Sequence, residues 1–435
     1  MTASHSTSKD DPIEISAGRK ASGRLRVPSS KSLTHRWLNL ALLSRKPMVV
    51  ERPLFAEDTR LFLAALGRCG FQVEERGDDV RLEPGDRPDG EVEVFCGNAG
   101  TMLRFLVATL GVVPGRWRLD GVPRLRERPV GPLVESLRRL GARIEYLAAE
   151  GYVPLRIEGG SLGAGTTYLD AGESSQYLSA ILMAALRAPG EVTVEVSALT
   201  SGPYVDVTLG VAEAAGGRIE RLGPKTWRVH PSDLRIDRAR VEGDWSAACY
   251  PASAAALTGG RVHLDGLASD SRQGDRGFLD LLLEMGAEAD WREDGLEVRG
   301  TGRLKGVEAD LSTMPDQVPT LAALGPFAAG QTRIFNVAHL RIKESDRLEA
   351  MATELRKLGA EVEEGPDSLR IPGIWSDSNP PAGPISIDPR GDHRIAMSLA
   401  LAGLRRPGVV IGSPEVVSKS YPGFWKDLQR LLGSG

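Results

Sequence analysis

Side chains that could move protons are concentrated in the second half of the 435-residue sequence. Asp316 lies between two prolines in TMPDQVP, so its carboxylate should sit on a stiff turn before an apolar stretch. Residues 341–348, RIKESDRL, contain three cations and two carboxylates. The sequence DHR at 392–394 precedes an apolar helix-like run, and Lys419 lies in SKSYP. Carboxylates beside cations suit acid–base chemistry on an anionic molecule, although each charged run alone is more typical of a solvated surface.

Four segments of the first half combine basic, hydroxyl or glycine residues with the start of a predicted helix. The segment SSKSLTHR at 29–36 places a serine and an arginine four residues apart, on one helix face. The glycine turn GNAGT at 97–101 opens an apolar helix, whose first N–H groups attract anions. Residues 124–129, RLRERP, contain three arginines, and residues 172–177, GESSQY, contain hydroxyl and amide groups.

These segments share one arrangement, because lysines and arginines recur at or just before the first turn of an apolar helix in both halves. Cations there are unfavourable to the helix dipole unless an anion accompanies them. The expected ligands therefore carry several anionic groups, such as phosphate and carboxylate, which arginine binds in a bidentate manner. GNAGT matches neither a P-loop nor the GxGxxG of dinucleotide-binding folds, so no nucleotide site is predicted.

A sixfold repeat would position these segments. Five leucine-rich or alanine-rich helical patterns each end at a glycine followed by an alternating strand pattern, and a sixth helix closes the chain. The aligned glycines are Gly70, Gly141, Gly216, Gly286, Gly359 and Gly433. Their spacings are 71, 75, 70, 73 and 74 residues, which suits a small α/β subdomain and predicts three repeats in each half.

The length also favours two domains, since single cores stop growing at about 250–300 residues. We expect one domain at 28–241 and another built from 13–27 together with 242–435. The crossover would lie near the Gly-Asp-Trp stretch at 243–245. Residues 1–12 are polar and should form a disordered tail.

Composition excludes several classes of function. The net charge of -4 argues against binding to nucleic acid, and no stretch approaches the roughly 20 apolar residues that span a membrane. The three cysteines are far apart and form no zinc motif, which predicts neither a disulfide framework nor a metal site. The N-terminus lacks the apolar segment of a signal peptide, so a cytoplasmic protein is expected.

In order and spacing, over about residues 13–433, these motifs resemble those of the EPSP synthases, members of the enolpyruvyl transferase family. The matching motifs are GNAGT, RxxERP, SSQ, RxKESDRL, DHRxAM and KSYP. The resemblance implies an α/β fold of two similar domains, each an inside-out barrel of three βαβαββ-type repeats, with a cleft between them. It also implies a monomeric transferase of the shikimate pathway, the glyphosate target of aromatic amino-acid biosynthesis, with no cofactor or metal.

The resemblance implies substrates and residue roles as well. The enolpyruvyl group of phosphoenolpyruvate would pass to the 5-hydroxyl of shikimate 3-phosphate, releasing phosphate through a tetrahedral intermediate. Phosphoenolpyruvate would contact Lys31, Asn98, Gly100, Thr101, Arg124, Gln176, Arg347, Arg394 and Lys419. Shikimate 3-phosphate would contact Lys31, Ser32, Arg36, Ser174, Ser175, Gln176, Ser201, Tyr204, Asp316, His339 and Lys343. Asp316 would be the general base and Glu344 the general acid, with Lys31 assisting.

Two positions depart from the pattern of that family. Phe105 stands where many members carry proline, and His339 stands where an asparagine that contacts substrate is common. Gly100 keeps the small side chain of glyphosate-sensitive members. Phe105 therefore leaves the shape of the phosphoenolpyruvate pocket open, and with it the response to glyphosate.

Three alternatives share parts of this pattern. UDP-N-acetylglucosamine 1-carboxyvinyltransferase has the same fold, but usually carries a reactive cysteine in a loop that matches residues 116–124, which contain none. A binding protein without turnover would not need both Asp316 and Glu344. An RNA 3′-phosphate cyclase should be more basic than this chain.

Overall fold

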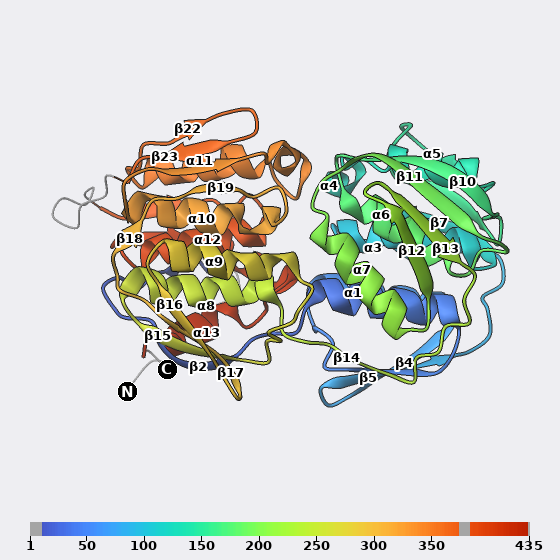
Figure 1. The fold of residues 1–435 in the computed structure, drawn as a ribbon, viewed down its shortest axis with the longest axis horizontal. Coiled ribbons are helices and arrows are strands. Elements are labelled where there is room, and N and C mark those ends of the chain that lie inside the picture. Colours follow the sequence, from blue (N-terminus) through green and yellow to red (C-terminus); the bar gives the residue numbers. More distant parts are fainter. Residues whose placement is uncertain (1–10, 374–382, 434–435) are drawn as a thin grey trace. The chain divides into compact units, whose positions relative to one another are not determined.

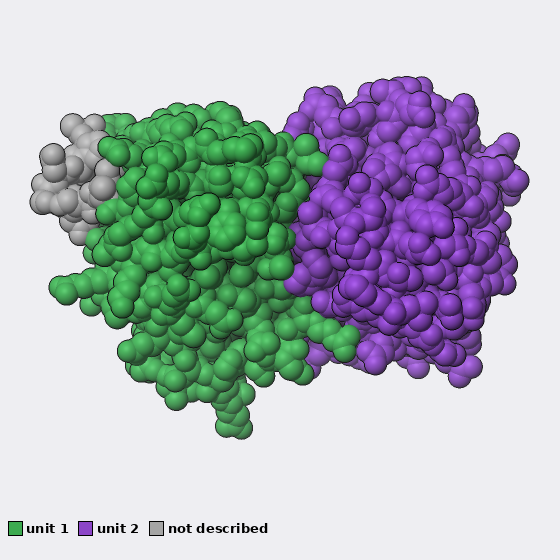
Figure 2. Space-filling view, turned by 45° about the horizontal axis from the view of Figure 1, so that its top comes forward, with its two compact units in different colours: residues 1–28, 243–435 green, residues 29–242 purple. Residues whose placement is uncertain are grey.

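The computed structural model describes residues 11–373 and 383–433, and its chain divides into two compact units. Unit 1 contains residues up to 28 and from 243 onward, and unit 2 contains residues 29–242 (green and purple in Figure 2). The boundaries expected from the sequence lie one residue away from these. Each unit has its own buried apolar cluster. The disordered tail expected at 1–12 lies outside the described residues except for its last two.

Unit 2 interleaves its helices with single strands and with runs of strands (Figure 1). Its helices are α1 (Lys31–Ser44), α2 (Glu57–Arg68), α3 (Gly100–Val112), α4 (Pro123–Arg126), α5 (Gly131–Arg139), α6 (Ser175–Ala185) and α7 (Pro203–Ala214). Its strands are β3 (Met48–Glu51), β4 (Phe71–Arg76), β5 (Asp79–Pro84), β6 (Glu91–Phe95), β7 (Gly115–Asp120), β8 (Arg143–Tyr146), β9 (Leu155–Gly159), β10 (Gly165–Ala171), β11 (Val192–Leu199), β12 (Arg218–Gly223), β13 (Thr226–His230) and β14 (Arg238–Arg240).

Unit 1 follows the same interleaving with shorter elements (Figure 1). Its helices, including 3-10 turns η, are α8 (Trp245–Thr258), η1 (Gly274–Gly277), α9 (Phe278–Glu284), η2 (Pro315–Gln317), α10 (Val318–Leu324), η3 (Gly325–Phe327), η4 (Ala338–Ile342), α11 (Arg347–Lys357), α12 (His393–Gly403), η5 (Pro414–Lys419) and α13 (Phe424–Leu431). Its strands are β1 (Ile13–Glu14), β2 (Ser22–Arg26), β15 (Arg261–Asp265), β16 (Glu288–Arg292), β17 (Gly295–Arg299), β18 (Leu304–Lys305), β19 (Glu308–Asp310), β20 (Ala328–Ala329), β21 (Thr332–Phe335), β22 (Glu363–Glu364), β23 (Leu369–Ile371), β24 (Ile385–Ile387) and β25 (Val409–Ile411).

The predicted repeat is confirmed by the sheets. In unit 2 the sheet orders are β14-β3-β5-β4, β6-β7-β9-β8 and β10-β11-β13-β12. Each sheet begins with a parallel pair and continues with two antiparallel strands. Unit 1 repeats this pattern in β2-β15-β17-β16 and β19-β21-β23-β22, and the shorter sheet β24-β25-β1 belongs to its last repeat. Strands β18 and β20 form a separate parallel pair.

Strands distant in the sequence complete the first sheet of each unit. Strand β2, near the N-terminus, pairs in parallel with β15 of unit 1. Strand β14, at the end of unit 2, pairs in parallel with β3 near its start. The chain therefore crosses between the units twice, at 28–29 and at 242–243, and each crossing leaves a short strand behind in the unit that it leaves.

Helices occupy the centre of each unit. In unit 2, α3 packs against α1 and α6, and nearly all of their residues are buried. In unit 1, α8, α10 and α12 pack against one another in the same way. A helix that is apolar on every side needs such a central place. The described sheets lie outside these helices and remain separate, which is the inside-out arrangement expected.

The aligned glycines of the repeat have a conformational role. All six have positive φ, between 68° and 103°, a region that residues with a Cβ rarely adopt. Each follows the helix of its repeat, and the first five turn the chain toward the next strand. Among the described residues, no helix is both long enough and apolar enough to cross a membrane.

Candidate active site

A buried arginine organises the carboxylates of unit 1. Arg347 is the first residue of α11, whose N-cap is an aspartate, and is 2% exposed. Its guanidinium donates to Asp316 Oδ1 at 2.8 Å, to Glu344 Oε2 at 3.0 Å and to Asp392 Oδ2 at 2.8 Å. Arg394, in the first turn of α12, donates to Asp316 Oδ2 at 2.7 Å. Asp316 is thus held between two arginines, and one of them also binds Glu344.

These ion pairs decide the charge of Asp316. Burial opposes its ionisation, but the charges of Arg394 and then Arg347 outweigh burial and hold the pKa of this carboxyl well below its usual range. Its side chain is 25% exposed, so a ligand can still reach it. Asp316 is therefore an ionised carboxylate that can accept a proton, although it is a weak base while both arginines bind it.

Asp392 supports this arrangement, although the sequence assigned it no role. Its side chain is completely buried and caps α12 by accepting the backbone N–H of Arg394 at 2.9 Å. It also accepts bonds from Ser345 Oγ at 3.1 Å and from Arg347 Nε at 2.8 Å. A buried carboxylate with several donors keeps its partners in fixed positions. Asp392 therefore fixes both arginines that bind Asp316.

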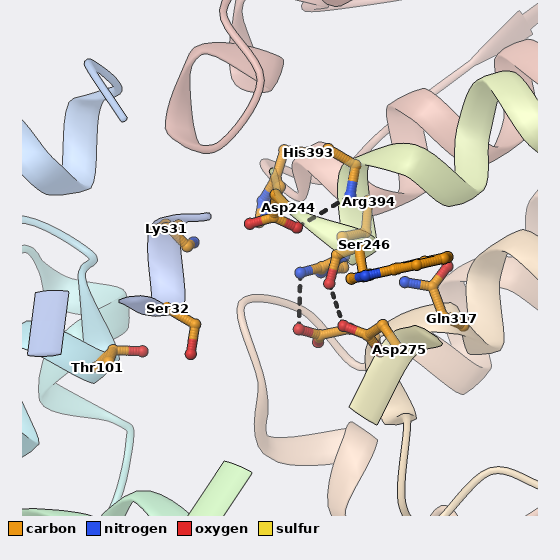
Figure 3. A network of polar contacts seen from close by, with 12 residues as sticks. Lys31, Ser32, Thr101, Asp244, Ser246, Asp275, Gln317, His393 and Arg394 are labelled. Carbon is orange, nitrogen blue, oxygen red and sulfur yellow. Dashed lines mark hydrogen bonds and ion pairs between the residues drawn. The ribbon is translucent and has the colours of Figure 1, made fainter. Parts of the chain in front are cut away.

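A second buried carboxylate, also missed by the sequence, lies near these groups (Figure 3). Asp275 is 3% exposed, and its Oδ2 accepts a hydrogen bond from the hydroxyl of Ser246 in the first turn of α8. Burial and the negative charge of Asp316 raise the pKa of Asp275 to about 6, although Arg394 and the Ser246 bond act in the opposite direction. Unit 1 therefore contains two carboxyl groups whose pKa values shift in opposite directions, upward for the buried Asp275 and downward for the partly exposed Asp316.

The other predicted residues of unit 1 lie on neighbouring turns. His339, in η4, is 8% exposed, and burial and then the charge of Lys343 lower its pKa to about 4. The charge of Lys343 also acts on Asp316. Lys419 is the last residue of η5, which packs against α12, and it is 6% exposed. Unit 1 thus provides Asp316, His339, Lys343, Glu344, Arg347, Arg394 and Lys419.

Unit 2 provides the remaining predicted residues, beginning with a buried arginine. Arg36, on α1, is 2% exposed and donates to Ser32 Oγ at 2.5 Å and to the Tyr204 carbonyl at 2.7 Å. It also donates to Thr208 Oγ1 at 2.8 Å, and its guanidinium lies 5.3 Å from the centre of the Phe105 ring. All these partners are neutral, and burial lowers the pKa of Arg36 to about 9. Such an environment favours a nearby anion.

Gln176 connects two motifs that the sequence proposed separately. Its amide nitrogen donates to Thr101 Oγ1 at 2.8 Å, and its amide oxygen accepts from Arg104 at 2.7 Å. Thr101 lies in the first turn of α3, whose N-terminus has no side-chain cap. Arg104 is 3% exposed and was missed by the sequence analysis, because it looks like one polar residue within an apolar helix.

The loop with three arginines lies over the same turn of α3. Arg128 Nη1 donates to the Asn98 carbonyl at 3.2 Å. A Cβ placed on Gly100 would lie 2.6 Å from Arg128 Nη2, so only glycine leaves room for this guanidinium. Arg124, in contrast, pairs with Glu127 at 2.7 Å and is about one-third exposed.

The serine motifs form the starts of two helices. Ser174 caps α6 by accepting the Gln176 N–H, and Ser175 is the first residue of that helix. Ser201 has a positive φ of 52° just before α7, which begins at Pro203. Lys31, the first residue of α1, pairs with Asp58 Oδ2 at 3.1 Å. The structure therefore places Ser32, Arg36 and Tyr204 together, and Asn98, Gly100, Thr101 and Gln176 together.

One group of side chains that could hold a metal ion exists among the described residues. His263, Asp265 and Asp294 bring their ligand atoms together in unit 1. Arg24 pairs with Asp265 and with Asp294 at 2.8 Å each, so an arginine already supplies positive charge to both carboxylates. We assign no metal to this group.

Comparison with known proteins identifies the family. The family model of EPSP synthase (3-phosphoshikimate 1-carboxyvinyltransferase) matches residues 15–428. A 3-phosphoshikimate 1-carboxyvinyltransferase of Syntrophobacter fumaroxidans is 45% identical, over 96% of this chain and 99% of that protein. One from Ralstonia pickettii is 41% identical, over 95% and 98%.

Solved structures agree with the sequence comparisons. An EPSP synthase of Acinetobacter baumannii superposes with a TM-score of 0.80 at 27% identity and covers 97% of both chains. A second structure of that enzyme gives a TM-score of 0.79. The match extends over both units and all six repeats. The chain therefore belongs to the EPSP synthase family.

Proposed function

We propose that this chain transfers the enolpyruvyl group of phosphoenolpyruvate to the 5-hydroxyl of shikimate 3-phosphate and releases phosphate. The observation that carries the proposal is Asp316, an ionised carboxylate held by Arg347 and Arg394, with Glu344 on the same Arg347. Addition of an alcohol to the enolpyruvyl double bond requires a base for the hydroxyl and an acid for the methylene carbon. Two carboxyl groups beside two arginines supply both functions and bind an anionic substrate.

Asp316 accepts the proton of the 5-hydroxyl while the hydroxyl oxygen attacks C2 of phosphoenolpyruvate. Glu344 donates a proton to C3. The product of this step is a tetrahedral intermediate that still carries phosphate on C2. In the second step, the bond from C2 to the phosphate oxygen breaks, the departing phosphate takes up the proton held by Asp316, and C3 returns a proton to Glu344, which restores the double bond. Lys31 assists by stabilising the negative charge of the departing phosphate.

Phosphoenolpyruvate would also raise the basicity of Asp316. The two arginines that bind Asp316 are those expected to hold the phosphate and carboxylate of phosphoenolpyruvate. An anion that shares Arg347 and Arg394 weakens their effect on Asp316, so the pKa of this carboxyl rises when the substrate is present. Proton transfer is therefore favoured in the complex rather than in the free enzyme.

Further contacts to phosphoenolpyruvate come from basic groups and a helix start. We assign them to Lys31, Asn98, Gly100, Thr101, Arg124, Gln176, Arg347, Arg394 and Lys419. The first turn of α3, at Gly100 and Thr101, has no side-chain cap, so its positive dipole end favours an anion. Gln176, oriented by Arg104 and Thr101, presents a fixed amide beside this turn.

Shikimate 3-phosphate combines a phosphate, a carboxylate and hydroxyl groups. We assign its contacts to Lys31, Ser32, Arg36, Ser174, Ser175, Gln176, Ser201, Tyr204, Asp316, His339 and Lys343. The supporting observation is Arg36, a buried cation whose described contacts are neutral and which lies beside Ser32. His339, with its pKa lowered to about 4, would contact this substrate as a neutral imidazole.

The alternative activity on UDP-N-acetylglucosamine is disfavoured by the cysteines. That enzyme usually relies on a reactive thiol in a mobile loop, whereas Cys69, Cys96 and Cys249 are all buried. Burial raises the pKa of each thiol, so none provides a reactive thiolate near neutral pH. The cytoplasmic location, the monomeric state and the absence of metal and cofactor stay predictions of the sequence.

Phosphate release tests the proposal. We expect release with phosphoenolpyruvate and shikimate 3-phosphate together, and none when UDP-N-acetylglucosamine replaces shikimate 3-phosphate. Asp316→Asn and Glu344→Gln should each lower kcat by about 10²- to 10⁴-fold, since each removes one proton-transfer group. Both variants should still bind the two substrates in calorimetry. Asp270→Asn, which changes an exposed carboxylate of unit 1, is the matched control and should keep the wild-type rate.

Two results would contradict this assignment. Absence of phosphate release by folded protein with the proposed pair would refute the activity. A wild-type rate in Asp316→Asn or Glu344→Gln would leave the activity standing but refute the role of that residue.

A further inference from the structure

Lys31 has a buried carboxylate neighbour that no motif predicted. Its Nζ lies 3.1 Å from Oδ2 of Asp58, in the first turn of α2. The Asp58 side chain is only 5% exposed, whereas the Lys31 side chain is 17% exposed. Helices α1 and α2 pack against each other, so the pair joins two elements 27 residues apart in the sequence.

The position of Lys31 makes such a neighbour necessary. Lys31 is the first residue of α1, and that first turn contains no acidic residue. A cation at a helix N-terminus is disfavoured by the dipole, and a lysine side chain is flexible, with several rotatable bonds. The negative charge of Asp58 offsets the unfavourable effect of the helix dipole on Lys31. Because the Asp58 side chain is buried, it also restricts the Lys31 ammonium to one place.

The pair still leaves Lys31 able to bind a ligand. Its side chain is 17% exposed while it is paired with Asp58, so a ligand can still reach it. The desolvation of two buried charges cancels much of the attraction between them. A buried ion pair is therefore weak evidence for a purely stabilising role. A charged and oriented ammonium is what binding of a phosphate requires.

We infer that Asp58 is a positioning residue that holds the Lys31 ammonium in place for phosphoenolpyruvate and its departing phosphate. The inference rests on the proposed function of Lys31 and adds to it the group through which Lys31 is controlled. Asp58 itself need not touch either substrate.

The test compares two neighbouring acidic residues. Asp58→Asn removes the charge beside Lys31, and Glu57→Gln removes an exposed charge from the same first turn of α2. Loss of helix-dipole stabilisation should be similar in both. We expect kcat/KM for phosphoenolpyruvate to fall about 10- to 100-fold in Asp58→Asn, as for a misplaced catalytic group. Glu57→Gln should stay within twofold of the wild type.

A double-mutant cycle separates positioning from stability. If Asp58 acts through Lys31, then Asp58→Asn should cause no further loss of kcat/KM when Lys31 is already methionine. Multiplicative losses in the double variant would overturn the inference. If Asp58→Asn does not fold, Asp58→Glu keeps the charge, displaces it by one methylene and should give an intermediate loss that also disappears beside Lys31→Met.

A chemical measurement makes the inference independent of turnover. Without its anionic neighbour, the Lys31 side chain should move more freely and be more accessible, so acetic anhydride should label it several-fold faster. Mass spectrometry of the Lys31 peptide gives the rate, with Lys46 of the same chain as the internal reference. Equal labelling of Lys31 in wild type and Asp58→Asn would overturn the inference. Full activity of Lys31→Met alone would instead refute the proposed role of Lys31.

Discussion

Replacement of Asp275 by asparagine should change how stability depends on pH. Asp275 is almost completely buried, and its pKa is raised to about 6 by burial and by the negative charge of Asp316. Asparagine has nearly the same shape as aspartate, and its amide oxygen can still accept the hydrogen bond from the Ser246 hydroxyl. The substitution therefore removes the ionisation of this group and leaves its main hydrogen bond in place.

The sign follows from the raised pKa. In the unfolded chain an aspartate titrates near 3.8, so between about pH 4 and pH 6 the folded protein keeps a proton that the unfolded chain has lost. The free energy of unfolding of the wild type therefore falls as pH rises through this window. Above about pH 6 the folded protein carries the full free-energy cost of ionising buried Asp275. The difference between the folded and unfolded pKa values sets this cost at about 3 kcal/mol. The free energy of unfolding of Asp275→Asn, taken relative to the wild type, should therefore rise by that amount as the pH increases from 4 to 7.

The comparison must be made as a difference between the two proteins. Asp316, whose pKa is lowered, contributes stability above the usual carboxyl range that is lost as pH falls, so it opposes Asp275 in the wild-type profile. This contribution is present in both proteins and largely cancels. Urea unfolding, monitored by hydrogen exchange of individual peptides, would measure the stability of unit 1 separately from that of unit 2. This separation is needed because two units need not unfold together.

Two observations would refute this reasoning. One is a stability difference between wild type and Asp275→Asn that stays constant from pH 4 to pH 7. The other is a carboxyl carbon resonance, assigned to Asp275 by its loss in the variant, that titrates near pH 4. Ser246→Ala is a useful companion, because the Ser246 bond lowers the pKa of Asp275 and its removal should move the titration above about pH 6.

Two further predictions concern substrate contacts. Gly100→Ala would place a Cβ 2.6 Å from Arg128 Nη2, so the guanidinium must move away from the first turn of α3. Because Gly100 and Thr101 of this turn are assigned to phosphoenolpyruvate, KM for this substrate should rise about 10-fold in steady-state kinetics, the scale of a misplaced contact. An unchanged KM would contradict the assignment of Gly100. His339, with its pKa lowered to about 4, should show a flat C2 proton shift from pH 5.5 to pH 8 in NMR spectra, and a midpoint near pH 6.5 would contradict its buried, neutral state.

The repeat could be predicted from the sequence because its ends depend on local chemistry. Each aligned glycine has a positive φ, which a residue with a Cβ rarely adopts, so the glycine marks the end of its helix wherever it occurs. The start of α1 was equally local, since Ser30 caps it as the serine pattern predicted. The pairing of β14 with β3 was not predictable, because β14 is the three-residue segment RAR and has no apolar alternation.

The candidate site shows the same division. The types of its residues could be recognised from motifs, but their pairing could not, since Arg394 and Asp316 lie 78 positions apart in the sequence. Asp58 and Asp275 were missed for a different reason. Each is a single carboxylate without a motif, and only the packing of neighbouring helices makes it buried and close to a functional cation or carboxylate.

The charges of unit 1 explain why the base should act only after substrate binding. Arg347 cannot leave the buried cluster, because Asp392, Glu344 and Asp316 all bind it, and Asp392 has no exposed surface. Arg394 is held near Asp316 by the start of α12, which Asp392 caps. In the mechanism that we propose, phosphoenolpyruvate therefore comes to these arginines and shares them with Asp316. Each negative charge of that substrate would weaken the attraction between the arginines and the Asp316 carboxylate, so binding of one substrate would prepare the proposed base for the hydroxyl of the other.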